Sequence, residues 1–508
     1  MLKISRSTIL NALSALAACT VAFLLLSVSL KTNNISDPLK INHQTMIAGP
    51  FESSNTTSRF ALVESIVNQG TFFFDLKLAR FAVSDVVEKD GKFFSSFTPG
   101  VSFLAVPFYM IGKVIGLPEF STFLSTVLFA VCNGVALYLL GRKVGVSKPA
   151  SLIGSTVFLF ATNALPYSAT LTQHHLSTLI ILLSVHNALE KRTILNNILF
   201  GLYCGIGFLF DFPNLFMLFP VGIYILSQHI QLNSGSKNLT INLKTIAIFI
   251  VIGLIPLLAV FGWYNKQILG SPINFAQFSA RTNYFDTTEK QLKDLLASEH
   301  KDPYQPTLPF NTRQQLDGFY VLLLSNERSW MWYSPVVLLG IFGLINLYKV
   351  NPRLSVLLTA IISTNIILYT MFGDPWGGWS FGPRYLIPSA ALLSFAVGYA
   401  VFTFRRNLVF VLLFLITLTY SVAISSSGAL TTTAIPPKKE SERLINYVPY
   451  TYKYGFILFE QNHTQSIVYH LVAKPYLSAY GFYLVYTSIL CALIYAITAT
   501  EVFSKRSK

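Results

Sequence analysis

Charged side chains are scarce in this sequence. Asp, Glu, Lys and Arg together make up 12% of the 508 residues, whereas 53% are hydrophobic. A soluble domain usually carries about twice that charged fraction, because charges help to cover a surface that faces water. So few charges exclude a large water-exposed surface, and the chain is predicted to be an all-α polytopic protein embedded in lipid.

Cysteine is also rare, and the basic residues are confined to short clusters. The four cysteines lie in apolar runs without disulfide or metal-ligand spacing, so free thiols are expected at Cys19, Cys132, Cys204 and Cys491. The formal net charge is +15. Because the basic clusters flank apolar runs, they indicate membrane topology, and no nucleic-acid partner is predicted.

Twelve apolar runs approach the roughly 20 residues that a helix needs to cross the hydrocarbon core. They cover residues 9–30, 121–141, 149–167, 175–190, 196–211, 213–228, 243–264, 333–348, 354–372, 385–403, 407–425 and 478–500. The first follows Lys3 and Arg6 and could be a signal peptide, but it is interpreted as a retained span because it has 22 residues and no clear cleavage site. A further run, 99–116, begins with Thr98-Pro99-Gly100.

The basic clusters orient these spans. They are Arg142-Lys143 with Lys148, Lys191-Arg192, Lys349 with Arg353, Arg405-Arg406, and Lys505-Arg506 with Lys508. With a cytoplasmic N-terminus and twelve spans, every cluster falls on the cytoplasmic side of an inner or plasma membrane. A full span at 99–116 would move the Arg142 cluster outside, so this run is predicted to be re-entrant or interfacial. The large outer loops are then 31–98, 265–332 and 426–477.

The first outer loop contains a segment with helical periodicity. Apolar side chains recur at positions 60, 63, 66 and 67, which predicts an amphipathic helix that lies in the membrane interface and ends at Gly70. The same loop carries polar groups that could take part in chemistry or simply be solvated: Glu52, Arg59, Asp75 and Asp85.

The most specialised segment is 373–385, between two apolar runs. Its four glycines and two prolines exclude a helix. Trp376 and Trp379 offer flat faces that can stack on sugar rings, with Tyr385 nearby, and Arg384 can hold a phosphate through two parallel hydrogen bonds. The alternative is a tight interfacial loop whose tryptophans belong to the aromatic belt.

A second short outer loop leads into His174-His175. A histidine at the mouth of a span can bind a phosphate or a metal, or cap a helix. No second ligand stands three or four residues away, so the spacing does not favour a metal site. The sequence implies no certain cofactor and leaves a divalent metal open.

The stretch Trp376-Gly377-Gly378-Trp379-Ser380-Phe381-Gly382-Pro383-Arg384-Tyr385-Leu386-Ile387-Pro388 resembles a signature of polytopic GT-C-type glycosyltransferases. More narrowly, it is similar to membrane proteins related to protein O-mannosyltransferases and to aminoarabinose and rhizobial lipopolysaccharide sugar transferases. Other similar segments follow the order of that group: 58–64 with Gly70-Thr71, 94–100, 270–272, and 333–335 after Glu327-Arg328. The resemblance covers roughly residues 45–390.

The resemblance implies a sugar carried on a polyprenyl phosphate, a first-loop Asp that acts as general base on the acceptor hydroxyl, and inversion of the anomeric configuration. A base must reach the acceptor, and cations must stabilise the leaving phosphate. Here the sequence departs from the pattern. Thr56-Thr57 stands where the acid is expected, and Ser96 and Phe97 replace a lysine near the Pro-Gly turn. Glu52 is then the first candidate base, followed by Asp75 or Asp85, unless the chain has lost the usual chemistry.

The sequence therefore predicts an inverting glycosyltransferase with a core over 1–400 and C-terminal membrane helices over 401–508. The expected partners are a polyprenyl-phosphate sugar, membrane lipid, and a glycan, lipid or protein acceptor. The assigned residues are Glu52 or Asp85 as base, Arg59, His174 and Arg384 on the phosphate, and Trp376, Trp379 and Tyr385 at the sugar.

Two other classes of function stay open. A non-catalytic transporter or flippase of lipid-linked sugars would use the same cations and aromatics without a base. The lack of internal duplication and the few charges within spans weigh against it. A structural subunit of an envelope-assembly complex is the third interpretation.

Overall fold

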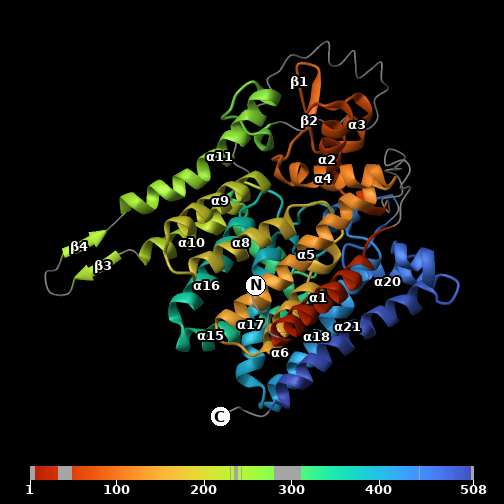
Figure 1. Ribbon diagram of the computed structural model, residues 1–508. Coiled ribbons are helices and arrows are strands. Elements are labelled where there is room, and N and C mark those ends of the chain that lie inside the picture. Colours follow the sequence, from red (N-terminus) through yellow and green to blue (C-terminus); the bar gives the residue numbers. More distant parts are fainter. Residues whose placement is uncertain are drawn as a thin grey trace.

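The computed structural model describes residues 6–31, 49–228, 230–233, 238–241, 243–279, 310–445 and 447–504. It is built mainly of α-helices, which form a bundle with a smaller module of the first outer loop on one end (Figure 1). The principal apolar helices are α1 (Arg6–Ser27), α4 (Gly100–Val114), α5 (Pro118–Lys143), α6 (Lys148–Phe160), α8 (His174–Ala188), α9 (Ile194–Phe210), α10 (Asn214–Ser227), α11 (Leu243–Leu269), α15 (Gly340–Val350), α16 (Pro352–Thr370), α17 (Ile387–Phe404), α18 (Leu408–Leu430) and α21 (Ala479–Val502).

Each of the twelve predicted runs overlaps one of these helices. By length and composition, six helices of the described chain can cross a membrane: α5, residues 250–269 of α11, α16, 384–404 with α17, α18 and α21. Large apolar side chains remain exposed along the helices, such as Phe219 on α10, Ile416 on α18 and Leu484 on α21. Such surfaces fit lipid and not water. The chain is an integral membrane protein, while the count of twelve spans stays a prediction.

The helix ends that were assigned to the cytoplasm gather together. Lys143 at the end of α5 pairs with Glu190, which follows α8. Arg405, after α17, pairs with Glu501 near the end of α21 at 2.9 Å, and Ser147 before α6 also donates to Glu501. These contacts bring the ends of α5 and α8 together, and those of α17 and α21 with the start of α6, while their cytoplasmic side stays a prediction. The cluster of Lys505, Arg506 and Lys508 lies outside the described residues.

Helix α4 corresponds to the run that was predicted not to span. Near its start, the Ser102 hydroxyl donates to the carbonyl of Arg59 at 2.9 Å. At its far end, Lys113 donates to the Asn68 side chain at 2.7 Å. Both ends of α4 therefore contact the same short stretch of the first outer loop. This arrangement supports the interfacial or re-entrant placement, which stays a prediction.

The first outer loop folds into a compact module. Helix α2 (Ser54–Glu64) begins at Ser53, whose hydroxyl accepts the Thr56 N–H, continues as a π-helix over Ser65–Gln69 and ends at Gly70, as predicted. Residues 55–63 are all buried, so α2 presents no exposed apolar face of its own, and its placement in the membrane interface stays a prediction. The helix is buried because α4, α3 (Leu76–Ala82) and the hairpin of β1 (Val86–Lys89) and β2 (Lys92–Ser95) pack around it.

The C-terminal helices contact the rest of the bundle directly. Helix α21 packs on α6 and α18, and α18 packs on α7 (Ala164–Tyr167). The segment that follows α18 contains two short helices, α19 (Lys438–Ser441) and α20 (Lys453–Glu460), before α21. The predicted boundary at residue 400 stays a prediction.

Candidate functional site

A cavity of about 770 Å³ lies among segments that the sequence assigns to the outer side. Its wall comes from the first outer loop, residue 173 before α8, the turn between α9 and α10, the segment after α11, the end of α16 with the loop that leads to α17, and residue 434. The predicted site residues that line it are Glu52, Asp85, Trp379, Arg384 and Tyr385. Long-range packing thus brings the first outer loop and the segment 373–385 to the same cavity.

Asp85 stands directly before strand β1 and is fixed by its main chain and its side chain. Its carbonyl accepts hydrogen bonds from the Ser58 hydroxyl at 2.7 Å and from the Ser96 N–H at 3.2 Å. Its carboxylate accepts the Ser54 hydroxyl at 2.7 Å. The carboxylate therefore has a defined position in the cavity wall, at the N-terminal end of α2.

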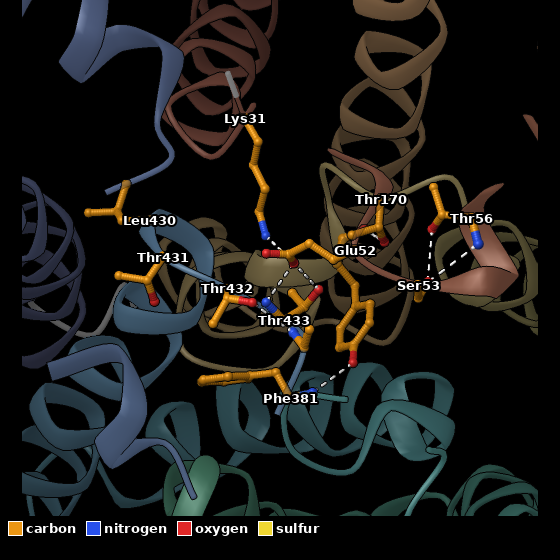
Figure 2. A network of polar contacts seen from close by, with 12 residues as sticks. Lys31, Glu52, Ser53, Thr56, Thr170, Phe381, Leu430, Thr431, Thr432 and Thr433 are labelled. Carbon is orange, nitrogen blue, oxygen red and sulfur yellow. Dashed lines mark hydrogen bonds and ion pairs between the residues drawn. The ribbon is translucent and has the colours of Figure 1, made fainter. Parts of the chain in front are cut away.

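Glu52 also lines the cavity, but its carboxylate binds three protein donors (Figure 2). Its Oε2 accepts the Lys31 ammonium at 2.5 Å, and both the N–H and the hydroxyl of Thr433 at 2.7 Å. Burial lowers the pKa of Lys31, and Glu52 opposes this effect. Glu52 consequently joins the end of α1, the first outer loop and the segment after α18.

Arg59 lies one layer behind the cavity wall. It is completely buried, donates to the Asn55 side chain and places its guanidinium 4.1 Å from the Phe97 ring centroid. Asn55 and Phe97 line the cavity, whereas Arg59 itself does not. Burial lowers the pKa of Arg59 to about 10, and the charges of Asp211 and Asp85 oppose this effect. Asn55 and Phe97 thus separate Arg59 from the cavity.

Arg384 enters the cavity at the end of the loop between α16 and α17. Its guanidinium lies 5.3 Å from the Tyr385 ring, which stacks on Tyr369 with centroids 4.5 Å apart. Gly377 makes room for this side chain: a Cβ there would stand 2.8 Å from Arg384 Nε, and φ is +72°. Trp379 also lines the cavity and donates its indole N–H to the Glu440 carboxylate at 2.6 Å.

Besides Arg59, two further predicted site residues do not line the cavity. His174 is buried at the start of α8, where its ring packs edge-on against Tyr167 and Tyr385. Trp376 is half-buried, and Lys439 lies 5.9 Å from its ring centroid. Contacts of these two side chains with a substrate stay predictions.

A buried arginine that the sequence analysis did not assign holds the loop around Trp376. Arg328 is completely buried, and its guanidinium donates to the carbonyls of Trp376, Gly378 and Ile435 at 3.0, 3.3 and 2.7 Å. Glu327 accepts the Lys438 N–H at 2.9 Å. The Glu327-Arg328 pair thus fixes the cavity loop to the segment after α18.

Asp211 is a second residue that the sequence analysis missed. It ends α9 and lines the cavity, and its two carboxylate oxygens accept side-chain amides from Gln173 at 3.1 Å and Gln277 at 2.9 Å. Burial raises the pKa of Asp211, while Gln277, Arg59 and Gln173 oppose this effect. A signal existed: Asp211 is the one acidic residue between Glu190 and Asp286, and it stands at the outer end of the predicted run 196–211.

The cavity wall therefore combines one arginine, Arg384, with aromatic rings and the carboxylates of Glu52, Asp85, Asp211 and Asp374, and Arg59 lies directly behind it. Such a set can bind an anion, stack on a sugar and accept a proton. In the described ranges, no group of three or more His, Cys, Asp or Glu side chains is arranged to hold a metal ion.

Comparisons with known proteins bear on the fold. No protein-family model matches the sequence, and no curated protein matches it. The chain is similar in structure to ArnT from Cupriavidus metallidurans bound to undecaprenyl phosphate, with a TM-score of 0.50, 10% identity, and coverage of 97% of this chain and 77% of that chain. The apo state of that ArnT has a TM-score of 0.49 and 12% identity, with coverage of 98% of this chain and 78% of that chain. A third similar structure is the archaeal oligosaccharyltransferase AglB from Archaeoglobus fulgidus in complex with an inhibitory peptide and a dolichol-phosphate. Its TM-score is 0.42 at 12% identity, with coverage of 85% of this chain and 57% of that chain.

The fold and the membrane-embedded bundle define the class. This chain is a polytopic membrane protein with the fold of the GT-C-type glycosyltransferases, to which ArnT belongs. The resemblance predicted from the sequence is confirmed at the level of the fold.

Proposed function

We propose that the chain transfers a sugar from a polyprenyl-phosphate donor to an acceptor hydroxyl, with inversion of the anomeric configuration. The observation that carries this proposal is the shared cavity: Asp85 of the first outer loop and Arg384 of the loop after α16 line the same space. The fold of ArnT, which is bound to undecaprenyl phosphate in one structure, supports this choice of donor.

The cations of the site suit a leaving phosphate. Arg384 lines the cavity, and its planar guanidinium can bind two phosphate oxygens at once. Arg59 adds a second positive charge from behind Asn55 and Phe97. These charges would stabilise the polyprenyl phosphate as it takes the electron pair of the bond to the sugar. Trp379 and Tyr385 would contact the sugar.

Asp85 is the better candidate for the general base. Three donors already converge on one oxygen of Glu52, and one of them is the Lys31 ammonium. These contacts engage Glu52 in holding the end of α1 and the segment after α18 together. Asp85 instead lies beside the Ser54 hydroxyl in the cavity wall. It would accept the proton of the acceptor hydroxyl while that oxygen attacks the anomeric carbon.

We also propose that the cavity opens at the outer face of the membrane and that the N-terminus is cytoplasmic. The support is that the cavity segments all belong to the predicted outer set, whereas the basic helix ends gather elsewhere. The basic ends would then follow the positive-inside rule.

The test is sugar transfer from synthetic polyprenyl-phosphate sugars by the purified full-length protein in detergent. Asp85→Asn should lower transfer by roughly 10²-fold or more, because a positioned base contributes about that much, and should leave donor binding unchanged. Glu190→Gln is the matched control, since this exposed carboxylate lies among the basic helix ends. Donor binding without turnover, across a panel of sugars and acceptors, would contradict the proposal and favour a transporter.

A further inference from the structure

One part of the cavity wall consists of hydrogen-bond acceptors. Gln173 and Gln277 each donate their amide N–H to a different oxygen of Asp211. All three residues line the cavity. Because an ionised carboxylate only accepts hydrogen bonds, it fixes which end of each glutamine amide faces it. The carbonyl oxygens of both glutamines must therefore point elsewhere.

Those two carbonyl oxygens have no protein donor within the described segments. Gln173 Oε1 and Gln277 Oε1 are both buried and lack a hydrogen-bond partner there, and Gln173 is only 6% exposed. A buried acceptor without a partner costs free energy, unless a ligand or water supplies the missing donor. The cavity is large enough for a sugar, at about 770 Å³.

From this arrangement we infer that Asp211, Gln173 and Gln277 form the subsite that binds hydroxyl groups of the donor sugar. This inference rests on the proposed function of the cavity. A sugar hydroxyl donates one hydrogen bond, and adjacent hydroxyls can satisfy closely spaced acceptors together. The subsite differs from the arginines, which attract the anionic phosphate.

The charge of the subsite predicts the class of sugar. Asp211 places a carboxylate beside the two acceptor oxygens, so a carboxylate on the sugar ring would meet electrostatic repulsion there. Neutral hexoses should therefore bind better than the corresponding uronic acids. A site of buried acceptors also rejects an analogue that lacks the matching donor, since the acceptors are then left unpaired.

The decisive experiment measures binding and does not require turnover. The probes are polyprenyl-phosphate esters of glucose, galactose and mannose, the esters of the three corresponding uronic acids, and sugar-free polyprenyl phosphate. The wild type should bind at least one neutral ester about tenfold or more tightly than its uronic acid counterpart. Asp211→Asn should reduce that ratio to within about threefold of unity, and binding of sugar-free polyprenyl phosphate should not change.

Further variants separate the subsite from general damage. Gln277→Leu should weaken binding of the neutral ester about tenfold and leave sugar-free lipid binding unchanged, whereas Glu190→Gln should alter neither. If Asp211→Asn does not fold, the inference is tested by whether Gln277→Leu weakens binding of the neutral ester and not of the sugar-free lipid. Equal wild-type affinity for neutral and uronic esters, or variants that bind like the wild type, would overturn the inference. Loss of transfer with sugar discrimination retained would contradict the proposed function alone.

Discussion

The Lys31 ammonium donates to the Glu52 carboxylate at 2.5 Å, and the two side chains are only 1% and 3% exposed. The same Glu52 oxygen binds Thr433, which is 381 residues further along the chain (Figure 2). The ion pair thus lies where three distant segments meet beside the cavity. A buried ion pair is costly to break, because the remaining partner keeps its charge without compensation.

Removing one partner of this pair should destabilise the protein. We expect Lys31→Met and Glu52→Gln each to cost about 3–5 kcal/mol, since each leaves a buried group unpaired. The measurement is the melting temperature of the purified variants in detergent. Lys31→Met combined with Glu52→Gln should recover part of the loss, because no buried charge is then left alone. If the double variant lost as much stability as the two single variants together, the two side chains would not be coupled as an ion pair.

Arg384 should determine the affinity for the phosphate. A hydrogen bond to a charged group contributes about 1.5–3 kcal/mol, so Arg384→Ala should weaken binding of sugar-free polyprenyl phosphate roughly 10–100-fold. Arg384→Lys should retain only part of this affinity, because a lysine ammonium cannot bind two phosphate oxygens in one plane. Arg353→Ala removes an exposed arginine at the start of α16 and is the matched control. Unchanged affinity in Arg384→Ala would rule out this assignment.

Arg328 should keep the loop around Trp376 ordered. Arg328→Met removes donors from the carbonyls of Trp376, Gly378 and Ile435, and each buried carbonyl left unsatisfied costs about 1–3 kcal/mol. We expect faster amide hydrogen exchange over residues 373–386 and 431–437. Peptides that cover 142–148, at the opposite helix ends, should exchange as in the wild type. Unchanged exchange in the loop would show that other contacts hold it.

The sequence predicts the helices and the motif residues but not the contacts between distant segments. The apolar runs predict the helices because a membrane span needs a long apolar stretch, and Gly70 marks the end of α2 through its local conformation. The motif residues Arg384, Trp379 and Tyr385 are found because specialised residues are concentrated in a short loop. Glu52 and Asp85 were candidates, but only the structure shows that Glu52 binds Lys31 and Thr433.

The missed residues depend on contacts between distant segments. Arg328 reaches Ile435 across 107 residues, and Gln173 reaches Asp211 across 38. Neither pair follows a helical or strand period that would reveal it. The burial of α2 was missed for a similar reason, since its polar residues pack against the β1–β2 hairpin and the cavity wall. Periodicity shows which face of a helix is apolar but not what covers the polar face.

The raised pKa of Asp211 leads to a prediction about pH. Burial raises this pKa above the ordinary value of 3.8, so the folded protein binds the proton more strongly than the unfolded chain does. The associated stabilisation is complete below about pH 3.8 and is lost as the pH rises through the raised pKa. Asp211→Asn cannot ionise, so it avoids this loss. We expect the melting temperature of the variant, relative to the wild type, to rise between pH 4 and pH 8. Glu190→Gln, which removes an exposed carboxylate, should show no such trend. A constant difference between Asp211→Asn and the wild type over this range would mean that Asp211 is not the buried titrating group.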